Sequence, residues 1–408
     1  MRMKKMKRLT MIKNKESHSY IYDYTRTAIG AFQGSLSSIK ATDLGAWVIK
    51  ELVTRNNLDK NKIESVTMGN VLSANLGQAP ARQAALGADL PYSTECLTIN
   101  KVCGSGLKAV MLSDESIRLG SSSLAISGGM ENMSLAPYYI DKARLGFGFG
   151  HKNITDAILK DGLWDPYNNY AMGNCAEVLC SEESYSRQDQ DNFAIESYER
   201  SNNAIKQGLF KNEITPIQIK TKKNEITFDT DEEPLKFSKE KITKLRPAFS
   251  KDGTITAANA SSLSDGAAAI LLGSASAEDN YKIIPKAKIL AHASFAFEPL
   301  YFTKSPIFAI EKVLEMTGMD INEIDLFEIN EAFSCVPMVA ADKLKIDYNK
   351  INIHGGAVSL GHPIGASGTR ILVTLLNALK IRKAKYGIAS ICIGGGEASA
   401  MIIENYDL

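Results

Sequence analysis

The chain has 408 residues, of which 44% are hydrophobic, so it is long enough for about two or three domains with a large buried core. Its 47 basic and 46 acidic side chains give a formal net charge of +1, which favours neither nucleic acid nor a membrane surface as a partner. The 6 cysteines show no paired spacing, which indicates a reducing compartment and argues against a zinc site. The sequence contains no run of about 18 apolar residues, so no transmembrane helix is expected.

Residues 1–19 differ in composition from the rest of the chain. Lysine, arginine and methionine dominate them, and the first acidic residue is Glu16. We interpret this segment as a basic N-terminal tail of a cytoplasmic protein. A mitochondrial presequence, which would direct the protein to the matrix, is the alternative, because presequences are also basic and poor in acidic residues.

Helix-like and strand-like patterns alternate through the first part of the body. The expected elements, in chain order, are a helix at 41–54, a strand at 63–68, a helix at 81–88, a short buried strand at 97–102, a helix from the glycine turn at 103–106 to about 119, and a strand at 124–127 that ends in a glycine pair. This alternation predicts a parallel α/β sheet with its functional groups at the carboxyl ends of the strands.

The pattern changes between about residues 132 and 246, which we interpret as an inserted subdomain that carries loops over the site. It contains aromatic and glycine-rich loops, a charged helix at 186–207 and an alternating stretch at 213–227. The α/β pattern then resumes with a sheet-like stretch at 253–261, a helix or strand at 266–272, a strand at 325–329, a glycine loop at 354–368, a helix to about 380 and a strand at 386–391. The two halves resemble a weak internal duplication, so their corners are expected to meet in one central site.

Cys103 lies at the predicted corner between a strand and a helix. Backbone N–H groups and the helix dipole favour an anion there, which predicts a thiol with a lowered pKa and the character of a nucleophile. The alternative is a small buried residue packed under a glycine-rich turn. On this stretch alone, the two interpretations have equal weight.

Three further side chains are candidates for chemistry. His362, held rigid by Pro363, pairs with Cys103 as the base of an activated thiol. His18 is interpreted as a tail residue, and His151 and His292 as surface residues or residues with satisfied hydrogen bonds. Cys392 ends a strand before three glycines whose N–H groups are suited to an oxyanion; the alternative is a buried strand cysteine. Asn330 either orients a water or caps the next helix.

These residues stand in segments whose order and spacing resemble those of the thiolase family, from about residue 25 to the C-terminus. The segments are Cys103-Gly104-Ser105-Gly106, Asn330-Glu331-Ala332-Phe333, Gly361-His362-Pro363 and Cys392-Ile393-Gly394-Gly395-Gly396. Two others, Gly355-Gly356-Ala357-Val358-Ser359-Leu360 and Asn259-Ala260-Ser261, are most similar to the short-chain, mitochondrial-type acetoacetyl-CoA thiolases (acetyl-CoA acetyltransferases).

The resemblance implies an α/β thiolase fold of five αβαβα layers, built from two similar βαβαβαββ halves with an inserted loop domain, and a homotetramer. The first half would comprise 20–132 and 264–287, the loop domain 133–263 and the second half 288–408. The implied activity is the reversible condensation of two acetyl-CoA molecules to acetoacetyl-CoA and CoA, through an acetyl group on Cys103.

The resemblance also implies a role for each site residue. His362 would deprotonate Cys103, and Cys392 would be the second acid/base, acting on the α-proton of the second acetyl-CoA. One oxyanion hole would combine His362 with a water held by Asn330, and the other would use the N–H groups of Cys103 and Gly394. No metal or redox cofactor is required for this chemistry.

Substrate and ion contacts follow from the same resemblance. Coenzyme A would contact Leu163, Met172, Phe249 and Ser261, the last at the pantetheine arm. A potassium ion would be bound by Tyr198 and by the carbonyl groups of Ala257, Ala258, Ala260 and Val358. The expected partners are therefore acetyl-CoA, acetoacetyl-CoA and CoA, with potassium as a hypothesis.

Four positions depart from the family pattern. Ala171 replaces a usual histidine, which predicts a lower affinity for acetoacetyl-CoA. His354 stands where asparagine is commonest, and we expect it to donate a similar hydrogen bond. Asp23 puts the first strand in doubt, because a buried unpaired carboxylate is costly. Phe302-Thr303 replaces a Phe-Pro, so tolerance of 2-methyl branches cannot be read from the sequence.

Two alternative functions remain beside the leading one. A degradative 3-ketoacyl-CoA thiolase of broader chain length would share the same residues. A non-catalytic acyl-CoA or lipid-binding thiolase-like protein would typically lack one of the reactive residues, so the combination of Cys103, His362 and Cys392 argues against it. A ketoacyl synthase is less favoured still, because such enzymes lack a cysteine in the role of Cys392.

Overall fold

The computed structural model describes residues 18–220 and 224–407, so the predicted basic tail lies almost entirely outside it. The first half contributes β1 (Tyr20–Arg26), β2 (Gly30–Ala31), α2 (Ala41–Arg55), β3 (Ser65–Gly69), α3 (Pro80–Gly87), β4 (Glu95–Ile99), α4 (Ser105–Arg118), β5 (Leu124–Asn132), β12 (Ser264–Gly273) and α8 (Ala277–Tyr281). The second half contributes β13 (Ala287–Ala296), α9 (Ser305–Thr317), β14 (Leu326–Ile329), α10 (Cys335–Leu344), α11 (Ala357–Leu360), α12 (Ile364–Arg382), β15 (Tyr386–Ile393) and β16 (Glu397–Asn405).

The segment between β5 and β12 adds no strand to the main sheet. It forms three small hairpins and three helices, which are β6 (Tyr138–Ile140) with β7 (Ile154–Asp156), β8 (Trp164–Asp165) with β9 (Tyr170–Ala171), α5 (Met172–Glu182), α6 (Arg187–Gln207), β10 (Ile217–Lys220) with β11 (Glu225–Phe228), and α7 (Lys239–Ile242). The predicted charged helix is therefore α6, which Ser186 and Asp189 begin with a capping box.

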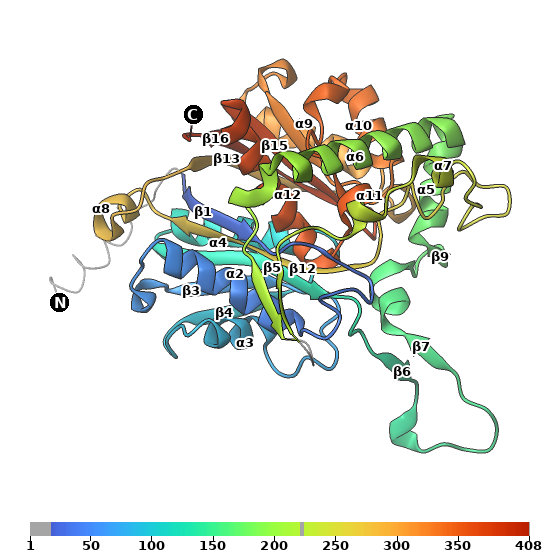
Figure 1. Cartoon of the computed structure of the whole chain (residues 1–408), viewed down its shortest axis with the longest axis horizontal. Helices are drawn as coiled ribbons and strands as arrows, with labels where there is room; N and C mark the ends of the chain where they lie inside the picture. Colours follow the sequence, from blue (N-terminus) through green and yellow to red (C-terminus); the bar gives the residue numbers. More distant parts are fainter. Residues whose placement is uncertain (1–17, 221–223, 408) are drawn as a thin grey trace, which may run out of the picture.

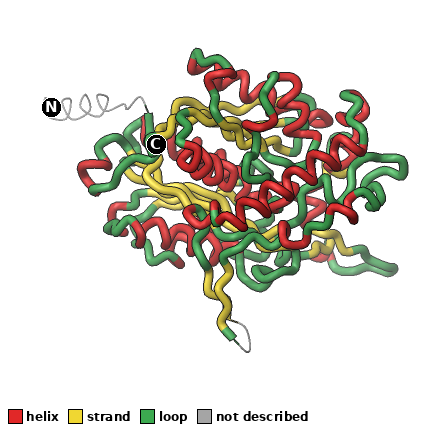
Figure 2. Tube along the Cα trace, turned by 45° about the horizontal axis from the view of Figure 1, so that its top comes forward, coloured by secondary structure: helices red, strands yellow, loops and turns green. Residues whose placement is uncertain are grey.

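Five layers alternate between helices and strands (Figures 1 and 2). The sheet runs in the order β14-β15-β16-β13-β1-β12-β5-β3-β4. Helices α2 and α3 pack on the outer face of the first half, α9 and α10 on the outer face of the second, and α4 and α12 lie between the two halves. The predicted αβαβα arrangement is confirmed.

The predicted parallel sheet is wrong in part, because the sheet is mixed. Among the strands of the described residues, only β3 with β4, β3 with β5, and β14 with β15 pair in parallel. Strand β15 turns directly back into β16 through Gly395 and Gly396, whose φ angles are +94° and +89°. A turn this short joins antiparallel strands, whereas a parallel pair needs a longer crossover.

Two strands differ from their predicted environments. Strand β4 is the edge strand of the sheet rather than a buried one, and Leu97 is 50% exposed. Strand β5 continues through Gly128 and Gly129 instead of ending there. A Cβ on Gly128 would collide with the neighbouring Ala268 backbone, so this glycine permits close packing within a strand rather than a turn.

The doubt about the first strand is resolved by the surroundings of Asp23. This residue is 1% exposed in β1, and its carboxylate accepts hydrogen bonds from Arg55 at 2.5 and 2.6 Å, from Asn56 at 2.6 Å and from Lys286. Burial alone would raise the pKa of Asp23, but Arg55 and Lys286 outweigh it and lower the pKa. The strand forms because its buried charge is paired.

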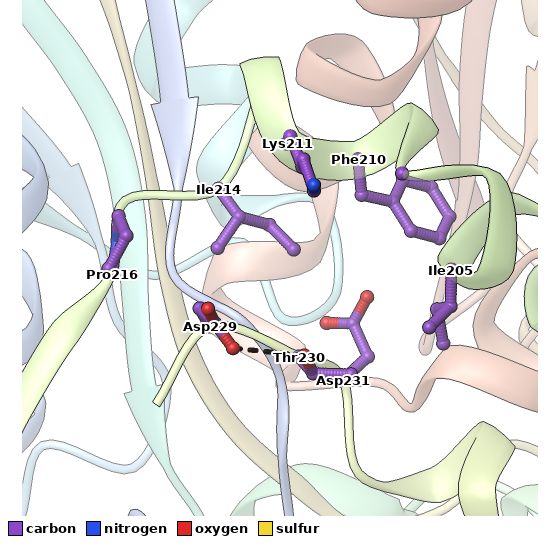
Figure 3. A pocket seen from close by; sticks show the side chains of 9 residues that line it. Ile205, Phe210, Lys211, Ile214, Pro216, Asp229, Thr230 and Asp231 are labelled. Atoms are coloured by element: carbon purple, nitrogen blue, oxygen red, sulfur yellow. Dashed lines mark hydrogen bonds between the residues drawn. The ribbon is translucent and has the colours of Figure 1, made fainter. Parts of the chain in front are cut away.

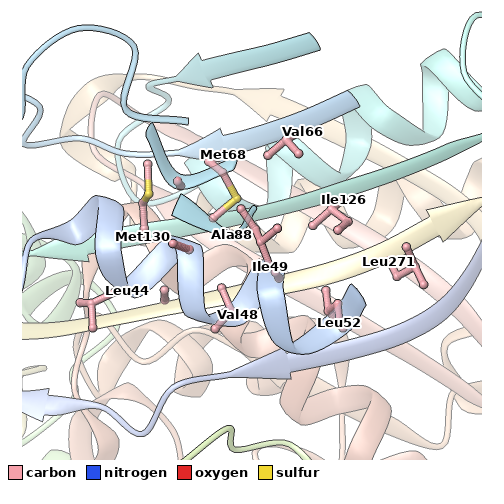
Figure 4. Close-up of a cluster of buried hydrophobic side chains, with 14 of the residues drawn as sticks. Leu44, Val48, Ile49, Leu52, Val66, Met68, Ala88, Ile126, Met130 and Leu271 are labelled. Carbon is pink, nitrogen blue, oxygen red and sulfur yellow. The ribbon is translucent and has the colours of Figure 1, made fainter. Parts of the chain in front are cut away.

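A hydrophobic core joins α2 to the strands of the first half (Figure 4). Leu44, Val48, Ile49 and Leu52 recur at helical spacing along α2, and all are fully buried. Helix α12 is similarly buried. It is the one helix, among the described residues, with the length and apolar composition of a membrane span, but 89% of that window is buried inside the fold, as in a core helix.

Candidate active site

The crossing of α4 and α12 brings two helix beginnings together. Cys103 lies just before α4, and His362 lies just before α12. A Cβ on Gly106 would lie 2.6 Å from the Thr369 side-chain oxygen and 2.8 Å from its backbone nitrogen, and one on Gly368 would collide with Leu107. The helices approach this closely because both positions are glycine.

The corner that holds Cys103 is locked by local hydrogen bonds. The Ser105 hydroxyl accepts the Lys101 N–H at 2.8 Å and donates to the Val102 carbonyl at 2.7 Å, while Asn100 accepts the Val102 N–H at 2.9 Å. Val102 has a φ of +45°, which is unusual for a β-branched residue. Backbone strain of this kind clusters at functional sites, and the sequence patterns did not indicate it.

The predicted lowering of the Cys103 pKa is wrong. Burial raises the pKa of this thiol to about 11; the backbone N–H groups of Gly394 and Cys103 oppose the rise, and the charge of Glu131 adds to it. The backbone N–H groups at the start of the helix do not outweigh the effect of burial on this pKa. No lysine or arginine lines the cavity to lower it further. The resting group is a thiol, so its activation requires a base.

His362 has the geometry of that base. It is 5% exposed, its Nδ1 lies 2.6 Å from the Ser367 hydroxyl, and this hydroxyl donates its single proton to the Pro363 carbonyl at 2.9 Å. Nδ1 must therefore carry a hydrogen, which leaves the lone pair on Nε2. Burial, with a smaller effect of Arg370, lowers the pKa of His362 to about 3, so the ring is neutral at pH 7.

Cys392 and Asn330 lie deeper than the first pair. Each is 1% exposed, at the carboxyl end of β15 and directly after β14, and these strands pair in parallel. Burial raises the pKa of Cys392 well above its usual range, and Cys103 raises it further. In the described chain, neither side-chain atom of Asn330 has a hydrogen-bond partner, so this amide is free to bind a further group.

A cavity of about 370 Å³, which we call the Cys103 cavity, opens beside Cys103 and His362. It is lined by Cys103, His362, Gly394 and all four residues predicted to contact coenzyme A: Leu163, Met172, Phe249 and Ser261. Ala171 and Phe302 also line it, whereas Cys392 and Asn330 do not. None of its lining residues is charged, so the cavity suits an uncharged, extended chain rather than phosphate groups.

Two buried carboxylates that the sequence analysis did not single out fix the surrounding loops. Glu131 accepts the N–H groups of Val71 at 3.0 Å and Gly365 at 2.9 Å, which anchors the start of α12. Glu331 accepts hydrogen bonds from Ser197 at 2.7 Å and from the Val358 N–H at 3.0 Å. Burial raises the pKa of Glu131 to about 7. Their signal in the sequence was a glutamate at or just after the end of a predicted strand.

The structure brings together only part of the predicted potassium site. Tyr198, Ala257 and Ala258 line a cavity of about 150 Å³, and Phe237 stacks on Tyr198 at 5.1 Å between ring centres. Ala257 and Ala260 both line the Cys103 cavity, and Val358 lines neither of the two cavities.

His354 does not behave as predicted. It lines neither of these cavities, and its buried Nδ1 has no hydrogen-bond partner among the described residues. Nδ1 therefore does not form the expected hydrogen bond within the described chain. Its ring instead lies edge-on to Phe210, at 6.0 Å between centres, because burial favours an aromatic contact.

A further cavity of about 350 Å³ contains none of the predicted site residues (Figure 3). It opens beside Phe210, Lys211 and Asp231. The Asp231 carboxylate accepts two hydrogen bonds from the buried Arg26 guanidinium, at 2.7 and 2.9 Å, and is thereby neutralised. This ion pair, which Glu213 joins at 2.6 Å, is part of the core rather than of a reaction site.

Comparison with known proteins agrees with this geometry. The structure is similar to that of the Acat5 thiolase from Ascaris suum in complex with coenzyme A, with a TM-score of 0.91 and 42% identity, over 95% of this chain and 100% of that one. This similarity, together with the layered fold and the paired corners, indicates an acyltransferase of the thiolase type. The models for the thiolase N-terminal and C-terminal domains match residues 19–276 and 283–405, so the chain belongs to the thiolase family.

Curated relatives extend along nearly the whole chain. Acetyl-CoA acetyltransferase 1 of Arabidopsis thaliana is 49% identical over 93% of this chain and 92% of its own length. The mitochondrial acetyl-CoA acetyltransferase of Rattus norvegicus is 48% identical over 94% of this chain and 90% of its own.

Proposed function

We propose that the protein is an acetyl-CoA C-acetyltransferase that reversibly condenses two acetyl-CoA molecules to acetoacetyl-CoA and CoA. The observation that carries this proposal is the meeting of Cys103 and His362, from the two halves, in one uncharged cavity. The names of the relatives support the same substrate class.

In the first half-reaction, His362 Nε2 takes the Cys103 proton as the sulphur attacks the thioester carbonyl of acetyl-CoA. The N–H groups of Cys103 and Gly394 stabilise the oxyanion of the tetrahedral intermediate. The intermediate then collapses, and the bond to the CoA sulphur breaks. Cys392 gives its proton to the departing CoA, which leaves acetyl-Cys103, a protonated His362 and a Cys392 thiolate.

In the second half-reaction, the Cys392 thiolate takes the α-proton of the second acetyl-CoA. His362 and a water held by Asn330 stabilise the enolate oxygen, and the enolate carbon attacks the acetyl group on Cys103. The bond between the Cys103 sulphur and the acetyl carbon breaks, acetoacetyl-CoA leaves, and Cys103 recovers its proton from His362. All three groups return to their starting states.

Acetylation of Cys103 tests this assignment directly. Brief incubation with acetyl-CoA, followed by acid quench and peptide mass spectrometry, is expected to show an acetyl group on Cys103. Cys103→Ala should abolish turnover and the acetyl label but retain CoA binding, whereas Cys96→Ala, a thiol outside the cavity, should retain both. Undiminished thiolysis by Cys103→Ala would disprove the nucleophile.

Leu163, Met172, Phe249 and Ser261 contact CoA, with Ser261 at the pantetheine arm, and the uncharged lining of the cavity supports this assignment. Ala171 lines the same cavity and provides no polar contact, so restoring a histidine there should lower the KM for acetoacetyl-CoA. The degradative alternative is tested by comparing rates of thiolysis of acetoacetyl-CoA and of a long-chain 3-ketoacyl-CoA. A preference for the long chain would replace the proposal.

Potassium is proposed to bind beside Tyr198, at the carbonyl groups of Ala257, Ala258, Ala260 and Val358. The cavity that Tyr198 shares with Ala257 and Ala258 supports this placement. Tyr198 is protonated at neutral pH, because burial raises its pKa to about 12, and would offer a neutral oxygen. Equal rates and affinities in sodium and potassium buffers of matched ionic strength would refute it.

A homotetramer is also proposed. The hairpin of β6 and β7 extends away from the body (Figure 1), and its strands and tip expose Tyr138, Ile140, Leu145, Phe147 and Phe149. An exposed apolar projection and the open edge of β4 are surfaces that proteins usually cover by association. Light scattering of Phe147→Asp/Phe149→Asp should show a smaller assembly; an unchanged mass would exclude this hairpin as the contact.

Two proposals concern organisation and location. The division into a first half (20–132 and 264–287), a loop domain (133–263) and a second half (288–408) is supported by which strands belong to the main sheet.

A cytoplasmic location is proposed, with the mitochondrial matrix as the alternative. A fluorescent protein fused behind residues 1–19 would separate them by its distribution in cells.

A further inference from the structure

A separate cavity of about 340 Å³ lies between the end of α6 and the end of α12. It shares no lining residue with the Cys103 cavity. Its polar lining consists of hydrogen-bond donors without any aspartate or glutamate: Arg200, Asn203, Gln207, His354 and Arg382. We propose that this arginine cavity binds a small phosphate-bearing molecule.

Arg382 supplies an uncompensated positive charge. It lies in the last turn of α12, and no carboxylate of the described chain forms an ion pair with it. Its neighbour Lys380, by contrast, is paired with Asp407 at 2.7 Å. A guanidinium in a cavity without acidic side chains attracts anions and can donate two parallel hydrogen bonds to phosphate oxygens.

Arg200 is fixed on the opposite side of the arginine cavity. Its guanidinium donates to the Ile351 carbonyl at 2.6 Å and to the Tyr348 carbonyl at 3.3 Å, and it also pairs with Glu196, whose side chain is 52% exposed. These contacts hold the group in place before any ligand arrives. A pre-positioned arginine loses little side-chain entropy when an anion binds.

His354 provides a buried donor that nothing else in the fold uses. It is 4% exposed, and its buried Nδ1 has no hydrogen-bond partner among the described residues. Burial, together with the charge of Arg382, lowers the pKa of His354 to about 4, so the ring is neutral and carries one N–H. A buried donor of this kind normally has an acceptor, and a phosphate oxygen would supply one.

The lining also indicates the size and class of the ligand. Two arginines and an imidazole offer donors to a group with many acceptor oxygens, as phosphate has. The carboxamides add to them, although Gln207 already donates one hydrogen bond to Asn203 at 2.9 Å. The volume is near the lower end of the range of about 300–1,000 Å³ that is usual for small-molecule sites. A free phosphorylated metabolite and the phosphates of CoA share this chemistry.

Calorimetric titration of the full chain with inorganic pyrophosphate at low ionic strength tests the proposal. We expect saturable binding that weakens at least tenfold in Arg382→Gln and is unchanged in Lys383→Gln, an adjacent exposed residue outside the lining. His354→Phe, which keeps the aromatic contact and removes the donor, should weaken binding about threefold. Equal thermal unfolding of Arg382→Gln and the parent protein would show that the fold is intact.

Repeating the titration with saturating CoA distinguishes the two sources. Unchanged pyrophosphate binding would identify a free metabolite, and competition that is lost in Arg382→Gln would identify the CoA phosphates. Three results would overturn the proposal: no saturable binding to the parent protein, equal affinities of the parent and Arg382→Gln, or equal competition by CoA in both.

Discussion

Replacement of Ser367 by alanine tests the most specific feature of the site, which is the orientation of the His362 ring. The Ser367 hydroxyl accepts the Nδ1–H of His362 at 2.6 Å, and this bond leaves the lone pair on Nε2 of a ring that lines the Cys103 cavity. Without the hydroxyl, the buried N–H has no acceptor. The ring can satisfy it only by rotating or by moving the proton to Nε2, and either change removes the base.

The expected magnitude follows from the cost of one buried, unsatisfied donor. That cost is about 1–3 kcal/mol. At about 1.4 kcal/mol for each factor of ten, kcat/KM should fall roughly 5- to 150-fold. The KM for CoA should change less than kcat, because Ser367 does not line the Cys103 cavity. Ser367→Thr, which restores a hydroxyl, should recover most of the rate.

Steady-state thiolysis of acetoacetyl-CoA, measured from pH 6 to 9 for the parent, Ser367→Ala and Ser367→Thr, provides the assay. Ser113→Ala is a matched control, because it removes a buried hydroxyl from α4 that bonds to Ser127 at 2.5 Å and does not contact His362. If Ser367→Ala keeps full activity, or if Ser113→Ala loses as much, the assignment of the lone pair to Nε2 has no support.

Three further predictions address the thiol, the helix crossing and the first strand. Alkylation of Cys103 by iodoacetamide in the free enzyme should accelerate about tenfold per pH unit from pH 7 to 9, because its pKa is about 11; a plateau near pH 7 would contradict this value. Gly368→Ala should lower the free energy of unfolding by about 1–3 kcal/mol and kcat by about 100-fold, since its Cβ would lie 2.9 Å from the Cβ of Leu107; unchanged turnover would show that the α4–α12 distance is not critical. Arg55→Met should lower the free energy of unfolding in urea by about 3 kcal/mol at pH 7, because it leaves Asp23 buried with less of its counter-charge. The pKa of Asp23 is lowered in the fold, so its stabilisation is present above pH 3.8 and is lost as the pH falls further; the penalty should shrink there, and a constant penalty would contradict the ion-pair explanation.

Local patterns were sufficient for most elements. The helical pattern at 41–54 and the charged run at 186–207 predicted α2 and α6 close to their observed ends, since both patterns depend on nearby residues. The strand pairing was less accessible. Which strand lies at the sheet edge, as β4 does, is decided by contacts between distant segments, and nothing within 97–102 encodes it.

Cys103 was ambiguous in the sequence, as either a nucleophile or a packed residue. The sequence was sufficient for the family resemblance, for the residues at the glycine-rich corners and for the expectation that both halves contribute to one site. Only the tertiary structure decided the protonation states: burial in an uncharged cavity raises the pKa of Cys103 and lowers that of His362. The tertiary structure also showed that Ser367 orients His362, the proposed base, and that His354 lines a separate cavity. A pKa depends on solvent exclusion and on charges from distant parts of the chain, and these are properties of the packed fold rather than of any local pattern.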